Sequence, residues 1–68
     1  MDRNVLAGKW KQLKGRAKQK WGALTDDELD SIEGDRDLLA GKLQEKYGYA
    51  RERADEEIDR FINEPDDR

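Results

Sequence analysis

Apolar residues in the first third of the chain recur at helical spacing. They are Leu6, Trp10, Leu13, Ala17 and Trp21. Intervals of four, three, four and four residues place all of them on one side of an α-helix. Gly22 follows directly, where a left-handed residue commonly ends a helix. The pattern therefore predicts a first helix that buries this stripe and ends at Gly22.

The next segment carries a helix start signal. Thr25 is followed three residues later by Glu28, which is a capping box: the Thr25 hydroxyl accepts from the Glu28 backbone N–H, and the Glu28 carboxylate accepts from the Thr25 N–H. Leu29 and Ile32 supply the buried side of this short helix. We expect Gly34 to end it.

A third helix is predicted after Gly34. Asp35 is a favourable N-cap residue. Leu39, Leu43 and Tyr47 lie four residues apart and share one face, which we expect to be buried. Gly48 is placed to end this helix.

A fourth helix is predicted from about Arg51 and halts before Pro65, because proline disfavours helix at the residue before it. Residues 49 and 50 offer no capping side chain, so its start is the least defined. Its inward residues are Ala54, Ile58, Phe61 and Ile62. We expect a single all-α domain over residues 1–62 and a frayed acidic tail over residues 63–68.

The two halves of the chain also resemble each other. Glycines occur at 8, 15 and 22 and again at 34, 41 and 48. An offset of 26 residues aligns both triplets, pairs Trp21 with Tyr47, and gives six identities in 25 pairs. The offset predicts an internal pseudo-repeat of two helix pairs, with Trp21 and Tyr47 facing one shared core.

Basic and acidic segments alternate along the chain, which argues against a surface that carries charge of only one sign. Of 68 residues, 46% are charged, and the net charge is -3. Residues 1–22, 23–37, 38–54 and 55–68 carry net charges of +6, -6, +2 and -5. Each basic segment thus precedes an acidic one, which favours pairing within the molecule.

The composition excludes several classes of chemistry. Histidine and cysteine are absent, so disulfides, thiolate metal sites and Ser/His/Asp or Cys/His catalytic sets cannot form. We expect no enzyme, cofactor or small-molecule ligand. The acidic residues between positions 26 and 33 do not match the calcium-binding loop of an EF-hand, because Ser31 stands at the position where that loop needs glycine. No stretch is apolar enough to span a bilayer or to act as a secretory signal, so a cytoplasmic location without membrane contact is expected.

Three stretches carry a resemblance to a known family. They are residues 8–15 (GKWKQLKG), 21–29 (WGALTDDEL) and 34–48 (GDRDLLAGKLQEKYG). In order and spacing they resemble the CsbD-like family of small bacterial general-stress proteins, and closely its YjbJ-type members. The match covers roughly residues 4–50. The resemblance implies four short helices in two orthogonally packed helical hairpins, stress-linked expression in the bacterial cytoplasm, and no catalytic residues.

The basic run of the first helix is one candidate site. Lysines interleaved with Trp10 and Trp21 are typical of proteins that track a nucleic-acid backbone without reading sequence. On a helical wheel, Lys11, Lys14 and Lys18 flank one side of the apolar stripe, and Lys9, Arg16 and Lys20 flank the other. The alternative is that these bases cover apolar surface and meet the acids of the second and fourth helices. We favour that alternative, with both tryptophans in the core.

The helical glycines are the other candidate site. Gly8, Gln12, Gly15 and Gln19 lie opposite the apolar stripe, and Gly41 lies opposite Leu39 and Leu43. A glycine inside a helix costs about 0.5–1 kcal/mol relative to alanine, so these positions need an explanation. One explanation is that a neighbouring helix approaches closely or that the helix is locally distorted there. The other is that the glycines leave a smooth face for a partner or for a second copy of the chain.

Two functions remain open from the sequence. The preferred one is a non-enzymatic stress-response protein that binds an unidentified protein partner or itself. The alternative is weak, sequence-independent nucleic-acid binding through Lys11, Lys14 and Lys18.

Overall fold

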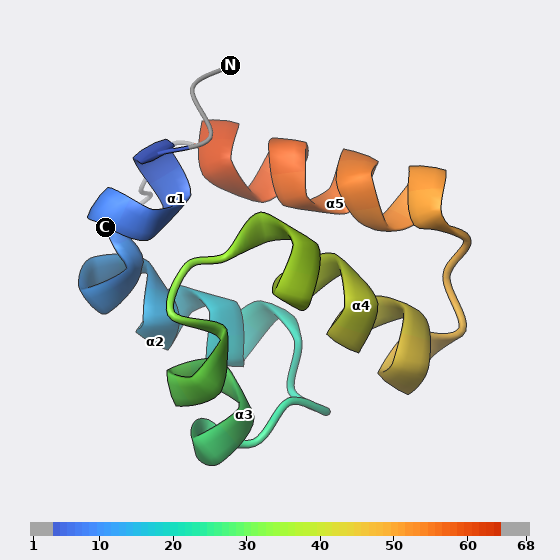
Figure 1. Cartoon of the computed structure of the whole chain (residues 1–68), viewed down its shortest axis with the longest axis horizontal. Helices are drawn as coiled ribbons and strands as arrows, with labels where there is room; N and C mark the ends of the chain where they lie inside the picture. Colours follow the sequence, from blue (N-terminus) through green and yellow to red (C-terminus); the bar gives the residue numbers. More distant parts are fainter. Residues whose placement is uncertain (1–3, 65–68) are drawn as a thin grey trace.

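A computed structural model describes residues 4–64 and shows only helices as regular secondary structure in that range. The helices are α1 (Asn4–Gly8), α2 (Trp10–Lys20), α3 (Asp26–Ile32), α4 (Arg36–Tyr47) and α5 (Arg51–Asn63). The predicted all-α class is confirmed. There are five helices where the sequence predicted four, because the first expected helix is divided into α1 and α2 (Figure 1).

The division lies at Lys9, directly after Gly8. Lys9 has φ -112° and ψ 12°, and its carbonyl accepts from Gln12 and Leu13 at 3.0 and 2.8 Å, so it opens a new helix. Glycine is a poor helix former, which lowers the cost of a break at this point. The predicted stripe is still buried on both sides of the break, from Leu6 to Trp21.

The predicted left-handed cap at Gly22 is wrong. Helix α2 ends at Lys20, and the Trp21 N–H closes its last turn on the Ala17 carbonyl at 2.8 Å. The positive-φ glycines among the described residues are Gly34 and Gly48. Trp21 takes the capping position with φ -120°, and its ring lies in the core, 5.0 Å from that of Phe61.

The starts of α3 and α4 are as predicted. Both bonds of the capping box form, from Glu28 N–H to the Thr25 hydroxyl at 3.1 Å and from Thr25 N–H to the Glu28 carboxylate at 2.9 Å. Asp35 caps α4 by accepting from the N–H groups of Asp37 and Leu38. Gly48 ends α4 in the left-handed region with φ +71°.

The turn between α3 and α4 is a close contact between distant parts of the chain. Glu33 and Gly34 both adopt left-handed conformations, with φ of 54° and 77°. A Cβ at Gly34 would stand 2.5 Å from the Ala7 Cα and 2.9 Å from the Leu6 carbonyl oxygen. The backbone of α1 therefore rests directly on Gly34, which only glycine permits.

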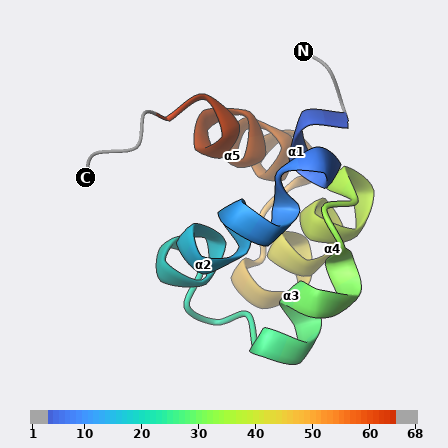
Figure 2. The ribbon, with the colours of Figure 1, turned by 90° about the vertical axis from the view of Figure 1, so that its left-hand side faces the viewer.

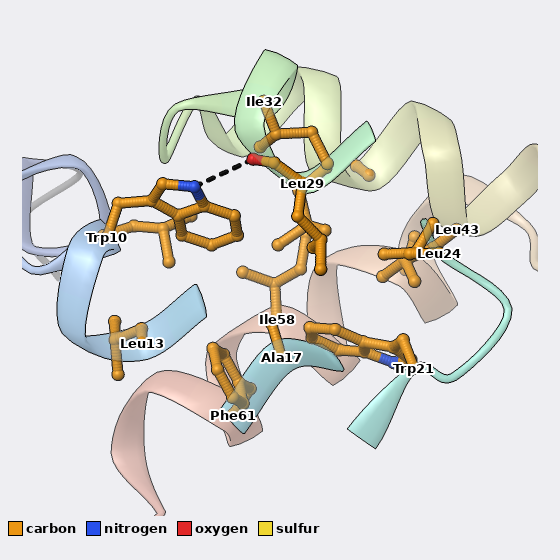
Figure 3. Close-up of a cluster of buried hydrophobic side chains, with 14 residues drawn as sticks. Trp10, Leu13, Ala17, Trp21, Leu24, Leu29, Ile32, Leu43, Ile58 and Phe61 are labelled. Carbon is orange, nitrogen blue, oxygen red and sulfur yellow. Dashed lines mark hydrogen bonds between the residues drawn. The ribbon is translucent and has the colours of Figure 1, made fainter. Parts of the chain in front are cut away.

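Helix α5 lies beside α4 in both views and runs in the opposite direction (Figures 1 and 2). It starts at Arg51 as predicted, without a side-chain cap at Ala50. One apolar core joins all five helices and the loop before α3 (Figure 3). Its members are Leu6, Trp10, Leu13, Ala17, Trp21, Leu24, Leu29, Ile32, Leu39, Ala40, Leu43, Ala54, Ile58 and Phe61.

The predicted burial of Tyr47 is wrong. Leu39 and Leu43 are fully buried, but Tyr47 is 38% exposed, whereas Trp21 is 2% exposed. At the end of α4, the Tyr47 ring stacks on Tyr49 instead, and its hydroxyl accepts from the Ala23 N–H at 3.2 Å. An amphipathic ring at a helix end can keep its polar tip near water. Of the predicted acidic tail, residues 65–68 lie outside the described residues.

Candidate functional site

The outer face of α2 carries the glycines and glutamines that the sequence singled out. Gly8, Gln12, Gly15 and Gln19 are all exposed. Among the described residues, no heavy atom beyond the local helix backbone lies within 4 Å of where a Cβ would stand at Gly8 or Gly15. The close-approach explanation is therefore wrong for these two positions, whereas the break directly after Gly8 is a local helix distortion of the kind expected as the other structural explanation. Gly8 belongs to α1, so the break at Lys9 interrupts the face between Gly8 and Gln12.

Gly41 is open in the same way but lies on another helix. It is an exposed residue in the middle of α4, and within residues 4–64 no heavy atom beyond the local helix backbone lies within 4 Å of its Cβ position. Helix α4 packs mainly on α5 and α3, and α2 packs on α1 and α3. Among the glycines in the described part of the chain, Gly34 is the one that another segment approaches closely. The sequence around it did not predict this contact.

Acidic residues of α3 neutralise one basic flank of α2. The Lys14 ammonium donates to the Asp30 carboxylate, and this bond raises the pKa of Lys14. The Lys18 Nζ lies 3.8 Å from the Asp26 carboxylate and donates to the Leu24 carbonyl at 2.9 Å. Two of the three lysines proposed for nucleic acid thus already have partners in the fold, as the favoured interpretation predicted.

Lys11 stands apart from these pairs. It is exposed, and neither it nor Lys9 forms an ion pair with any of residues 4–64. The remaining uncompensated charge of α2 is therefore concentrated in its first turn.

The other basic flank of α2 meets a single carboxylate. Arg16 Nη2 and Lys20 Nζ each lie 3.6 Å from an oxygen of Glu64, the residue that follows α5. The favoured interpretation expected these bases to meet acids of the last helix. The acid that does so is Glu64, directly after α5, which the sequence analysis had placed in a frayed tail.

Glu28 connects the capping box to α4. Its carboxylate accepts from Thr25 N–H and also lies 3.1 Å from Lys46 Nζ and 3.4 Å from Lys42 Nζ. The bond from Thr25 and then the Lys46 ammonium lower the pKa of Glu28 to about 2. Within residues 4–64, no three acidic side chains gather in a way that could hold a metal ion.

The start of α4 is tied to α5 by Arg36. Its guanidinium donates to the Asp59 carboxylate at 2.6 Å and to the Asp55 carbonyl at 3.0 Å. Arg51 adds contacts to Asp37 at 2.7 Å and to Asp55 at 3.2 Å. These charges hold the α4–α5 pair together and are not free for a ligand.

The sequence analysis did not predict two features of the surface, an exposed leucine and a pair of stacked tyrosines of which Tyr47 is exposed and Tyr49 is partly buried. Leu38 on α4 is 52% exposed. The stacked Tyr47 and Tyr49 rings are 5.5 Å apart between centroids, and the Arg53 guanidinium lies 4.8 Å from the Tyr49 centroid. No helix in the described part of the chain is both long and apolar enough to cross a membrane.

Comparison with known proteins identifies the family. The CsbD-like family matches residues 4–56. A UPF0337 protein of Pectobacterium atrosepticum is 53% identical over 58 residues, which is 85% of this chain and 84% of that protein. The UPF0337 protein YjbJ of Escherichia coli strain K12 is 50% identical over 58 residues, with the same coverage of the two chains. A UPF0337 protein of Pseudomonas aeruginosa is 51% identical over 61 residues, which is 90% of this chain and 94% of that protein.

No solved structure matches the chain. The family match extends past Tyr49 into α5, where the sequence pattern alone had become generic. Together, the match over most of the chain and the relatives at about half identity show that this chain belongs to the CsbD-like family.

Proposed function

We propose that this protein is a non-enzymatic stress-response protein of the bacterial cytoplasm that acts by binding a protein partner or a second copy of itself. The outer face of α2, made by Gln12, Gly15 and Gln19, is the proposed contact surface together with Gly8 at the end of α1, and Gly41 on α4 is a second contact point. The stress role rests on family membership. The non-enzymatic role rests on a chain without histidine or cysteine.

The observation that carries the proposal is the open space at Gly15. A helical glycine costs about 0.5–1 kcal/mol relative to alanine, and here no neighbouring helix needs the missing Cβ. Packing within the fold therefore does not explain the glycine. A flat face allows the backbone of a partner to approach α2 closely, and Gln12 and Gln19 can donate and accept hydrogen bonds at its edge.

The test combines sedimentation of the purified protein with affinity capture from stressed cells, with and without nuclease. Gly15→Gln adds bulk to the proposed face, and Gly22→Gln adds the same bulk at an exposed glycine after α2 whose Cβ position is also open among the described residues. We expect Gly15→Gln alone to lose a dimer or a captured protein. If the wild type and both variants are monomeric and capture the same proteins, the proposed surface is ruled out.

Weak nucleic-acid binding is the second candidate. It is favoured by Lys9 and Lys11, which have no ion pair with residues 4–64, and disfavoured by the pairing of Lys14 and Lys18 with α3. Phosphate binding releases counterions, so the affinity must fall steeply with salt. Charge reversal of Lys11, Lys14 and Lys18 should then abolish binding of labelled DNA at low salt.

The packing of the helices as two orthogonal hairpins related by a pseudo-repeat stays a prediction. Superposition of residues 8–32 on residues 34–58 would test it.

A further inference from the structure

Arg16 and Lys20 form a two-cation site at the end of α2. They are one helical turn apart, and each lies 3.6 Å from a different oxygen of the same Glu64 carboxylate. Their side chains are partly buried, with 30% and 25% of their surfaces exposed. One anionic group thus bridges two cations that the fold holds side by side.

The core supports these cations from beneath. The Arg16 guanidinium lies 5.4 Å from the Phe61 ring centroid, and Lys20 Nζ lies 5.9 Å from the Trp21 ring centroid. Both rings are buried and pack against each other (Figure 3). Attraction between a cation and an aromatic face favours this placement, so the site does not depend on Glu64 alone for its shape.

A phosphodiester presents two oxygens in much the same way as a carboxylate does. Arginine binds both groups through its planar fork, and lysine binds them as a point charge. Lys9, the N-cap residue of α2, precedes Arg16 by seven residues, which corresponds to about 10 Å along the helix axis. Because Lys9 has no ion pair with residues 4–64, a linear polyanion gains a further contact that the Glu64 carboxylate cannot make.

We propose that Arg16 and Lys20 bind a phosphate of a single-stranded nucleic-acid backbone, and that Glu64 occupies this site as an internal competitor. The inference rests on the nucleic-acid candidate above and moves its contact to the other flank of α2. The cations contact only phosphate, which carries no sequence information, so the binding is independent of sequence. The buried rings of Trp21 and Phe61 cannot stack on bases.

The experiment is an anisotropy titration of a labelled single-stranded oligonucleotide at low salt. Glu64→Gln removes the competing charge. Glu56→Gln is the matched control, because it changes the net charge equally at an exposed position of α5. Exposed ion pairs are individually weak, so Glu64→Gln should bind about three- to tenfold more tightly than Glu56→Gln. Replacing Arg16 and Lys20 with Gln in the Glu64→Gln protein should remove the gain.

A denaturant midpoint measured for each variant shows that it is folded. Glu64→Asp keeps the charge but shortens the side chain, and it should give an intermediate affinity. Equal affinities of Glu64→Gln and Glu56→Gln, with measurable binding, would overturn the role of Glu64 and leave nucleic-acid binding standing. The absence of binding by any variant at low salt would overturn both.

Discussion

The indole Nε1 of Trp10, at the start of α2, donates a hydrogen bond to the backbone carbonyl of Leu29 in α3 at 2.9 Å (Figure 3). Leu29 lies in the last turn of a seven-residue helix, where carbonyls take partners from outside the helix. Trp10 thus fills core volume and also satisfies a polar group. This bond fixes the position of α3 against α2.

Trp10→Phe tests this bond. Phenylalanine keeps most of the apolar contact but cannot donate, so the buried Leu29 carbonyl loses a partner. The free energy of unfolding should fall by about 1–3 kcal/mol. Chemical denaturation measures the change, and an unaltered midpoint would show that the bond to Leu29 does not contribute to stability.

Trp21 and Tyr47 should differ sharply on truncation, although the repeat pairs them. Trp21→Ala empties a buried site against Phe61 and should cost about 3–5 kcal/mol, which is enough to unfold most of so small a domain. Tyr47→Ala removes a half-exposed ring and one hydrogen bond, and should cost only about 1 kcal/mol. Circular dichroism and denaturant midpoints compare them. Similar losses would contradict the burial difference.

Alanine at Gly15 or Gly41 should stabilise the isolated protein. Both glycines are helical, have no positive φ, and have open space around the Cβ position. Each substitution restricts the unfolded chain and should add about 0.4–1 kcal/mol. The readout is a higher denaturant midpoint at an unchanged slope. A lower midpoint at either position would mean that the added methyl group meets a neighbour there, which would contradict the open space around the Cβ position.

Alanine substitutions at Gly34 and Gly48 distinguish the energetic cost of a left-handed backbone from the cost of a clash with a neighbouring segment. Both are left-handed, but only Gly34 has a neighbour at its Cβ position, the Ala7 backbone at 2.5 Å. Gly48→Ala should cost about 1–2 kcal/mol from the left-handed conformation alone. Gly34→Ala should cost more, because α1 must also move away. Equal losses in denaturation would mean that α1 is not held on this turn.

Glu28 should give the protein an acid-dependent part of its stability. Its pKa is lowered from an ordinary value of 4.5 to about 2 in the folded protein. The folded state therefore binds fewer protons than the unfolded state, and this stabilisation is complete above about pH 4.5 and is lost as the pH falls towards 2.

The variant Glu28→Gln keeps an oxygen that can accept from Thr25 but loses the charge that faces Lys42 and Lys46. It should be less stable than the wild type at pH 7, and the two should converge near pH 2. Denaturant midpoints at both values measure this, with Glu56→Gln as the control. A constant difference across the range would exclude the titration of Glu28 as its cause.

Helix capping and apolar periodicity, which depend on residues close in sequence, were sufficient to predict most of the helices. The capping box at Thr25, the Asp35 cap and the stripe from Leu6 to Trp21 depend on residues close in sequence, and all three were predictable. The break at Lys9 was not, because it accompanies the docking of α1 on Gly34, a residue far along the chain.

The same limit explains the candidate sites. Helical angles separated the two basic flanks of α2 and indicated that the outer glycines were not part of the stripe. They could not show which acids Lys14 and Lys18 would meet, nor that Glu64 returns to Arg16 and Lys20. Those contacts depend on how α3 and the end of α5 pack around α2.

The interior of the described chain contains no buried charged or polar side chain. With no histidine or cysteine anywhere in the sequence, neither a proton near neutral pH nor a mild thiol oxidant can alter a group inside it. The ion pairs on the described surface, by contrast, are open to the solvent. Ionic strength, which screens exposed pairs, is then the variable to which its behaviour should respond first.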